Sequence, residues 1–267
     1  MNKTIKWLDI ICRYFICLLM LIYGLVKVFQ GQFYTDYYWK DITLGHLSGM
    51  ELAWSFYSYS PVFETILGLI EVSIGLLVFF KRTTKLGVIL FLPVMANLVL
   101  INIIFSIGAL GSAFPLFVAG IILFLINFRS YKTLISEKQN FVNKKNKLWL
   151  NSVSKVIVIL MGCGLASLVI YNNKFRMKQD NAIKGAWLVA GNSGIRRIYF
   201  EKGNTCVIRD NKDSLYFGNY QTNSNNTISI TGSNNVFPGW KEAPYTIHND
   251  TLSVNAHDSQ QLLLRIR

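Results

Sequence analysis

The sequence predicts a membrane all-α helical bundle of about five transmembrane helices, followed by a small extracytoplasmic all-β meander or barrel. Composition is the first observation behind this prediction. Of the 267 residues, 52% are hydrophobic and 15% are charged, whereas soluble domains carry about 25% charged residues. The second observation is a series of long apolar runs before residue 172. The third is a change, after that residue, to short alternating runs separated by turn residues.

The apolar runs are long enough to cross a membrane, because a helix needs about 20 mostly apolar residues to span the hydrocarbon core. The first run contains Asp9 and Arg13 and is too long for a cleaved signal peptide. We therefore expect five retained spans at 8–29, 62–80, 86–107, 110–128 and 153–171. The expected domains are a four-helix domain at 1–129, a basic cytoplasmic loop at 130–152, the fifth helix at 153–172 and a β-domain at 180–267.

The positions of lysine and arginine predict the orientation, since the cytoplasmic flanks of spans carry an excess of them. They gather on one side of the predicted spans, at Lys3, Lys6, Lys81, Arg82, Lys85 and along 130–152. The 30–61 segment on the other side has only Lys40, although Lys174, Arg176 and Lys178 follow the fifth span there. We expect a cytoplasmic N-terminus, an outer β-domain and a bacterial cytoplasmic membrane. This pattern accounts for the net charge of +13 without a nucleic-acid partner.

The 30–61 segment between the first two spans is rich in aromatic residues, including Tyr37, Tyr38, Trp39 and Trp54. Rings with one polar edge prefer the headgroup layer of a bilayer. We expect the segment to lie against the outer interface, with a lid over a peptide or substrate site as the alternative.

The part after residue 185 shows alternation typical of strands, at 186–190, 195–201, 204–209, 214–220, 227–231, 243–248, 251–255 and 260–266. Their even spacing predicts an up-and-down meander that closes into a small barrel or sandwich. Gly185 and Trp187 resemble the start of a lipocalin-like first strand. We expect Trp187 to close the base of the barrel as a packing residue, and the interior to hold at most a small ligand.

Charged groups inside a span cost about 2.5–3.5 kcal/mol each on the insertion scale, so each calls for a partner. One stripe of the first span carries Asp9, Arg13, Gly24 and Lys27, and one face of the second carries Glu64, Gly68, Glu71 and Gly75. Small residues let two helices approach closely. We therefore expect Glu71 to pair with Arg13 or Lys27, and Glu64 to lie nearer the outer surface.

Two interpretations of these charges stay open. They lock two helices together, or they form a polar pocket for a quinone headgroup or a proton relay. In the third span, Asn97 and Asn102 are about 140° apart on a helix, so we expect only Asn97 to face such a pocket. The candidate pocket residues are Arg13, Lys27, Glu64, Glu71 and Asn97.

No catalytic residue is assigned, because the sequence has no GxSxG, P-loop, HExxH or strand-linked GxGxxG motif. His46 is the one histidine near the predicted spans, so paired histidine ligation of a haem is not expected. The four cysteines form no CxxC and predict neither a disulfide framework nor a metal site. The cofactor stays unknown at this point, with quinone as the candidate.

The first four spans resemble the DoxX-like family of small bacterial membrane proteins. The resemblance rests on Arg13, the run Tyr23 to Lys27, Glu71 with the following Gly75-Leu76-Leu77, the run Lys81 to Thr83, and Asn97. It covers roughly residues 7–128. It implies a cytoplasmic-membrane bundle, sometimes associated with quinone-linked or thiol-linked redox complexes, in which Arg13, Lys27, Glu71 and Asn97 are the buried polar positions.

The function that follows as an expectation is an accessory subunit in quinone-linked redox or oxidative-stress processes, with lipid, quinone or a redox protein as partners. The first alternative is a membrane-anchored envelope binding or assembly protein that presents the β-domain. A small-molecule transporter is the third, although the five spans show no evident inverted repeat. No reaction follows from the sequence.

Overall fold

The computed structural model describes residues 3–136, 148–177, 182–191, 194–232, 240–256 and 259–266. The chain divides into two compact units. The first, here the bundle unit, comprises Met1–Tyr34 and Leu47–Asn173, and the second, the barrel unit, comprises Thr35–His46 and Lys174–Arg267. Of the predicted basic loop at 130–152, residues 137–147 lie outside the described residues, as does Lys178. Residues 130–136 and 148–152 are helical, so the predicted loop is too long at both ends.

The bundle unit confirms the predicted helical membrane part. Its helices are α1 (Lys3–Val28), α2 (Gly49–Ser58), α3 (Pro61–Phe79), α4 (Thr84–Ile104), α5 (Leu110–Ser136) and α6 (Leu148–Met177). Within the described residues, all of these except α2 are long and apolar enough to cross a membrane. The chain is therefore a multi-pass membrane protein.

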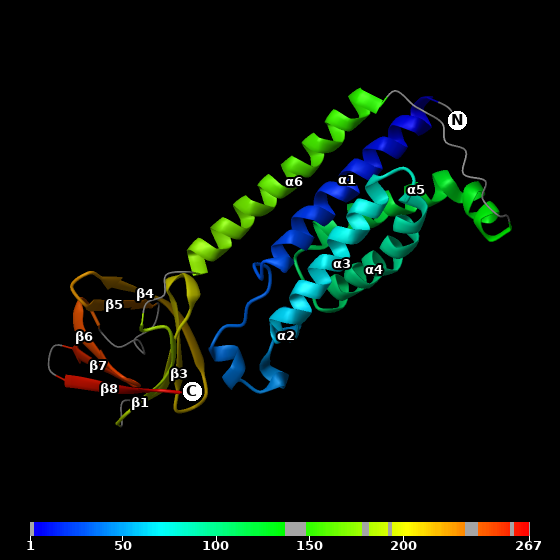
Figure 1. Ribbon diagram of the computed structural model, residues 1–267. Coiled ribbons are helices and arrows are strands. Elements are labelled where there is room, and N and C mark those ends of the chain that lie inside the picture. Colours follow the sequence, from blue (N-terminus) through cyan, green and yellow to red (C-terminus); the bar gives the residue numbers. More distant parts are fainter. Residues whose placement is uncertain are drawn as a thin grey trace. The chain divides into compact units, whose positions relative to one another are not determined.

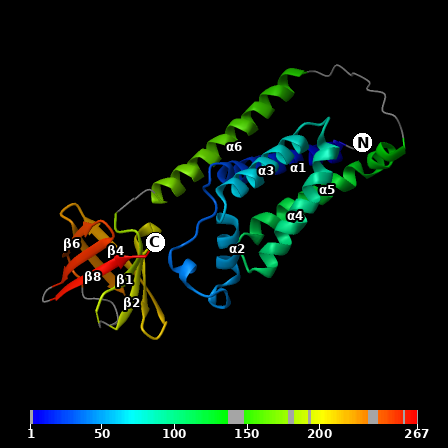
Figure 2. The same cartoon turned by 60° about the horizontal axis from the view of Figure 1, so that its bottom comes forward.

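Four helices close a ring, in which α1 and α4 each pack against both α3 and α5 (Figures 1 and 2). The ring encloses an apolar core with Ile16, Val78, Phe91 and Leu123 at its centre. The long helix α6 adds Val158 and Ile159 to a smaller cluster formed by α1 and α3. Because neighbouring helices are antiparallel, the C-terminal ends of α1 and α4 and the N-terminal ends of α3 and α5 lie at the same end of the bundle.

Glycines bring α1 and α3 into backbone contact. A Cβ atom added at Gly24 would lie 2.8 Å from the carbonyl oxygen of Gly68, and one added at Gly68 would collide with the carbonyl oxygen of Gly24. Further along α3, a Cβ at Gly75 would lie 2.8 Å from the Cβ of Met20. Only glycine permits this approach, which sets the distance across which side chains of the two helices meet.

The segment expected as an interface loop contains regular structure. Short 3₁₀ helices cover Tyr38–Asp41 and Leu44–His46, and α2 follows. Ser48 and Glu51 form a capping box at the start of α2, with Ser48 Oγ accepting from Glu51 N and Glu51 Oε2 accepting from Ser48 N. Residues 35–46 group with the barrel unit, a division that no sequence pattern indicated.

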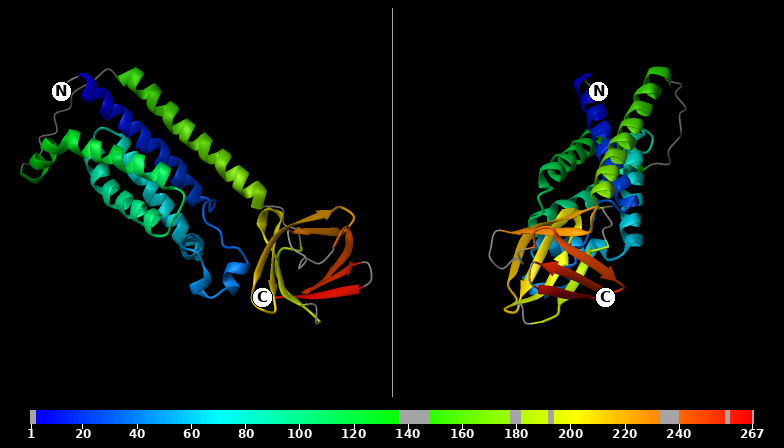
Figure 3. Two further views of the ribbon diagram at one scale, coloured as in Figure 1. Left: turned by 180° about the vertical axis from the view of Figure 1, so that it is seen from behind. Right: turned by 90° about the vertical axis from the view of Figure 1, so that its left-hand side faces the viewer.

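The barrel unit confirms the predicted β-domain. Its strands are β1 (Gly185–Val189), β2 (Ile195–Phe200), β3 (Thr205–Asp210), β4 (Leu215–Asn223), β5 (Thr227–Gly232), β6 (Ala243–His248), β7 (Thr251–Ala256) and β8 (Ser259–Arg265). Each strand pairs with the next in antiparallel fashion, and β8 returns to β1, so the sheet closes (Figure 3). Closure removes the exposed strand edges.

The barrel interior is filled by side chains, among them Trp187, Phe200, Tyr220 and Trp240. The Trp187 side chain is fully buried and donates its indole N–H to the carbonyl oxygen of Ile183 at 2.6 Å, while the Arg265 guanidinium lies 4.7 Å from the ring centroid. Gly185 has φ of 140°, a conformation that glycine adopts without strain.

Gly68→Ala should destabilise the bundle, because the added methyl group forces α1 and α3 apart; overpacking of this kind typically costs about 1–3 kcal/mol. The measurement is the thermal midpoint of the detergent-solubilised full-length protein. Gly164→Ala on α6 is the matched control, since nothing lies within 4 Å of its added Cβ. Equal midpoints for the two variants would show that the α1–α3 approach is not tight.

Candidate functional site

A buried ion pair joins α1 and α3. The ammonium nitrogen of Lys27 lies 2.6 Å from both carboxylate oxygens of Glu71, and each residue is 5% exposed. Burying two charges carries a desolvation penalty that only close and well-aligned contact offsets. The glycine contact between the helices provides that closeness, because Lys27 follows Gly24 and Glu71 follows Gly68 by one turn each.

A second buried ion pair lies toward the other end of the ring. Arg13 donates to the carboxylate of Asp9 at 3.0 Å and to the carbonyl oxygen of Phe79, the last residue of α3, at 3.0 Å. The guanidinium thus binds an unpaired carbonyl at a helix C-terminus, where positive charge is favoured. Of the two partners considered for Glu71, the structure therefore selects Lys27, and Arg13 closes a pair within its own helix.

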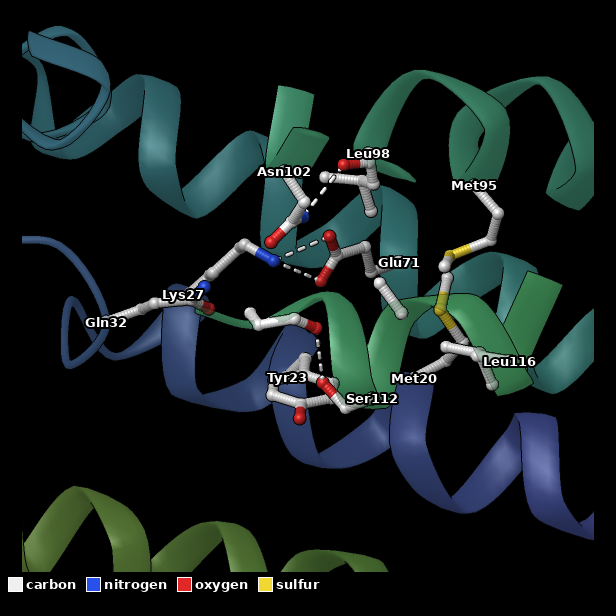
Figure 4. A pocket seen from close by; sticks show the side chains of 12 residues that line it. Met20, Tyr23, Lys27, Gln32, Glu71, Met95, Leu98, Asn102, Ser112 and Leu116 are labelled. Atoms are coloured by element: carbon white, nitrogen blue, oxygen red, sulfur yellow. Dashed lines mark hydrogen bonds and ion pairs between the residues drawn. The ribbon is translucent and has the colours of Figure 1, made fainter. Parts of the chain in front are cut away.

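The Lys27–Glu71 pair lines two adjoining cavities of about 250 and 80 Å³. Both cavities share the residues Lys27, Gln32, Glu71, Leu98, Asn102 and Ala109. Figure 4 shows the smaller cavity, with Lys27 and Glu71 facing Asn102 across it. The arrangement is a single polar centre between two apolar lobes, which we call the Lys27–Glu71 cavity.

Aromatic residues form one wall of the larger lobe. Phe33 stacks on Tyr57 with ring centroids 4.8 Å apart and meets Trp54 edge-on at 5.4 Å. On the α3 side the wall includes Ile70, which is 44% exposed on the outer surface of the bundle. That side of the lobe is therefore separated from the surroundings of the bundle by a single layer of side chains.

Both asparagines of α4 line the larger lobe, which contradicts the expectation that only Asn97 would face a pocket. The lining residues of α4 are Val94, Asn97, Leu98, Ile101 and Asn102. At 100° per residue they cover an arc of about 140°, with the two asparagines at its edges. The expectation failed because it assumed a narrow pocket, whereas this lobe wraps around α4.

Two amide oxygens at the polar centre have no hydrogen-bond partner within the described part of the chain: Asn102 Oδ1 and Gln32 Oε1. The orientation of the Asn102 amide follows from its nitrogen, which donates to the carbonyl oxygen of Leu98 at 2.8 Å. Its oxygen therefore points into the cavity, as Figure 4 shows. A buried acceptor without a donor is unfavourable by about 1–3 kcal/mol, so these atoms favour a ligand that donates hydrogen bonds.

Glu64 holds the chain that leaves α1. Its carboxylate, 3% exposed as a residue, accepts from the backbone N–H groups of Gln32 at 3.2 Å and Phe33 at 3.3 Å. Glu64 lies in the first turn of α3, where the helix dipole favours a negative charge. It does not line either lobe, but it positions two residues that do.

The structure thus brings Lys27, Glu71 and Asn97 to one cavity, places Glu64 behind the cavity wall, and leaves Arg13 at the opposite end of the ring. Asn97 is exposed, so the expectation that it is a buried polar position is wrong, and Asn102 is the buried asparagine of α4.

The pocket residues expected from the sequence did not include Gln32, Trp54 and Tyr57, which line the larger lobe; all three belong to the 30–61 segment, for which a lid was the alternative expectation. The capping box at Ser48 and Glu51 was the available signal, because it predicts the helix that presents Trp54 and Tyr57.

No group of three or more histidine, cysteine or acidic residues suited to a metal ion occurs among the described residues. The four cysteines are free, and Cys163 alone of these is exposed. In the barrel, burial raises the pKa of Cys206 to about 12, so its thiol stays protonated and unreactive.

One curated protein is similar to the chain: "Uncharacterized protein YwoB" of Bacillus subtilis strain 168, which is 32% identical over 126 residues. The aligned part covers 47% of this chain and 80% of that protein. No family model matches the chain. No solved structure matches it either.

Loss of one partner of the ion pair should destabilise the bundle more than loss of both. Glu71→Leu or Lys27→Met leaves a buried unpaired charge and should cost about 3–5 kcal/mol, whereas the double variant should regain most of that loss. Unfolding midpoints of the three variants in detergent form a double-mutant cycle. Additive losses would mean that Lys27 and Glu71 do not interact.

Proposed function

We propose that this chain, which belongs to the same family as YwoB of Bacillus subtilis, binds the headgroup of a lipid-soluble ligand of the quinone class in the Lys27–Glu71 cavity. The observation that carries the proposal is the polar centre, in which an ion pair and two unpartnered amide oxygens lie between apolar lobes. Such a centre recognises a polar headgroup, while the lobes accept apolar substituents.

The size and walls of the cavity support an amphipathic ligand. The larger lobe, at about 250 Å³, approaches the lower end of the roughly 300–1,000 Å³ range of small-molecule sites. That volume suits a ring-sized headgroup, with the apolar tail of the ligand outside the lobe. Ile70 lines the lobe and is also 44% exposed on the bundle, so a ligand dissolved in the bilayer has a short route in.

The unpartnered atoms favour the reduced form of a quinone. Asn102 Oδ1 and Gln32 Oε1 accept hydrogen bonds, and a quinol offers two hydroxyl donors where a quinone offers none. Each neutral hydrogen bond contributes about 0.5–1.5 kcal/mol. We therefore expect the quinol to bind about tenfold more tightly than the quinone.

The resemblance to DoxX-like proteins supports a role for the chain as an accessory subunit in quinone-linked redox or oxidative-stress processes. On this proposal Lys27, Glu71 and Asn97 bind the ligand, Glu64 positions the wall, and Arg13 stabilises the far end of the bundle. The distribution of basic residues supports a bacterial cytoplasmic membrane, an N-terminus inside and the barrel outside.

The test is the binding of a short-chain quinol and the matching quinone to the purified full-length protein, followed by quenching of tryptophan fluorescence. The parent protein should bind the quinol, and Glu71→Gln should weaken binding at least about tenfold, because it abolishes the ion pair at the polar centre. Asp9→Asn is the matched control, since it weakens an equally buried pair that lines neither lobe. Equal quinol affinity in parent and Glu71→Gln, or none in the parent, would reject the proposal.

A second candidate function is envelope binding or assembly through the barrel. Leu188 and Leu264 lie directly opposite each other on β1 and β8 and are 39% and 46% exposed. Leu262 of β8 is 42% exposed as well, and contiguous exposed apolar residues mark interaction sites when they form a large patch.

A photo-crosslinking residue at Leu264, introduced into the full-length protein in cells, should form an adduct with an envelope protein. Gln221 on the exposed side of β4 is the control position. The same adducts at both positions, or none at Leu264, would count against this second function.

A further inference from the structure

The outer face of the barrel carries residues that are buried where exposure is expected. Along β2 the side chains of Ile198 and Phe200 point into the core, so Arg197, Tyr199 and Glu201 point outward. Yet Tyr199 is fully buried and Glu201 is 2% exposed. Something must cover them, and within the barrel unit the cover is the segment Thr35–His46.

The segment contacts two sets of cross-strand neighbours on the outer face of the barrel, one apolar and one charged. Tyr199, Val207 and Phe217 lie opposite one another on β2, β3 and β4, and the Tyr38 ring packs on Phe217 at 5.6 Å and on Tyr199 at 6.4 Å. Next to this row, Arg197 and Arg209 are paired in register. Like charges directly opposite each other repel, so this pair of arginines calls for an anion.

Asp41 of the segment is that anion. Its carboxylate pairs with Arg197 and accepts a hydrogen bond from the Tyr199 hydroxyl, while Arg209 donates to the Asp41 backbone oxygen at 3.1 Å. Partial burial opposes the charged form, but hydrogen bonds from Arg197 and Tyr199 outweigh it and lower the pKa of Asp41. Asp41 therefore stays charged at physiological pH and is a permanent anchor.

Glu201 also binds the segment, and its carboxyl group can change its protonation state near neutral pH. Its two carboxylate oxygens accept from the backbone N–H groups of Tyr37 and Tyr38, both at 2.9 Å. Burial raises the pKa of Glu201 to about 7, and the two N–H donors only partly offset it. The charged groups around it are Asp36 of the segment, which raises the pKa, and Lys202 beside it, which lowers it. The Tyr220 hydroxyl from β4 donates to the Glu201 backbone oxygen at 3.3 Å.

We propose that the barrel is a latch for the segment Thr35–His46, which closes as the surrounding pH falls and loosens as it rises through neutrality. The sign follows from linkage. Release exposes Glu201 to water, where its pKa returns toward the ordinary value near 4.5, so the closed state binds the proton more tightly. Acid therefore favours the closed state, and a charged Glu201 at alkaline pH favours release.

The latch regulates the proposed ligand site through the chain itself. Gln32 and Phe33 line the Lys27–Glu71 cavity, and only Tyr34 separates them from the latched segment. Release of the segment removes the restraint on the C-terminal side of these wall residues, while the hydrogen bonds from their N–H groups to Glu64 remain. This effect on the ligand site rests on the proposed function. The proposed topology determines which compartment's pH the latch senses. The pH-dependent contact between the segment and the barrel depends on neither proposal.

Hydrogen–deuterium exchange of the full-length protein in nanodiscs tests the latch directly. The readout is the protection of the Tyr37 and Tyr38 amides, corrected for the intrinsic pH dependence of exchange. In the parent this protection should fall at least about tenfold from pH 5 to pH 8. Glu201→Gln, which stays neutral, should abolish the pH dependence, and Glu242→Gln, which alters an exposed carboxylate of the same unit, should keep it.

A flat profile in the parent, or the same slope in Glu201→Gln, would overturn the latch. If Glu201→Gln unfolds the barrel, seen as lost protection at Leu252 and Val254 of β7, the profile of the parent alone decides. The two proposals fail separately. Quinol binding that depends on Glu71 can persist without a pH-dependent latch, and the exchange profile is measured without any quinol.

Discussion

The contact of α1 with α3 at Gly24 and Gly68 is the constraint on which the bundle depends. It brings Lys27 and Glu71 to 2.6 Å in a buried setting, where a longer separation would leave two costly charges unpaired. The pair in turn fixes the offset and rotation of the two helices, because both partners sit one turn from the glycine contact. The cavity exists around this pair, with α4 and α5 completing its walls.

Charged groups at both ends of the ring and on the barrel also have hydrogen-bond or ion-pair partners. Arg13 satisfies Asp9 and a terminal carbonyl of α3, and Glu64 satisfies two backbone N–H groups of the chain after α1. On the barrel, Asp41 separates two arginines that face each other on neighbouring strands. Each of these charges has specific partners: those in the bundle are buried, and those on the barrel are partly buried. The Lys27–Glu71 pair differs from the other charged groups because it lies beside a cavity that contains two hydrogen-bond acceptors without donors. For that reason a ligand-binding function is proposed for this pair alone.

Sequence periodicity identified the elements well. The predicted spans and strands correspond to observed helices and strands, because apolar runs and alternation report directly on each element. The ends differ most at the predicted loop 130–152, since α5 continues to Ser136 and α6 begins at Leu148. Helical phase also placed Gly68 and Glu71 on one face of α3. It did not decide between Arg13 and Lys27, since both lie on one stripe and only the axial offset of α1 against α3 selects between them. Likewise, an angle of about 140° between Asn97 and Asn102 says nothing about how wide a cavity is.

Residue composition and periodicity are enough to identify a multi-pass membrane protein with a β-domain, and to find the polar residues within its apolar segments. Those properties depend on the composition and period of each segment alone. Packing between elements selects which charges pair, brings Gln32 and Asn102 to one cavity, and places residues 35–46 in the barrel unit. These outcomes depend on how separate elements are offset and rotated against one another, and that is set by backbone contacts between residues far apart in the chain.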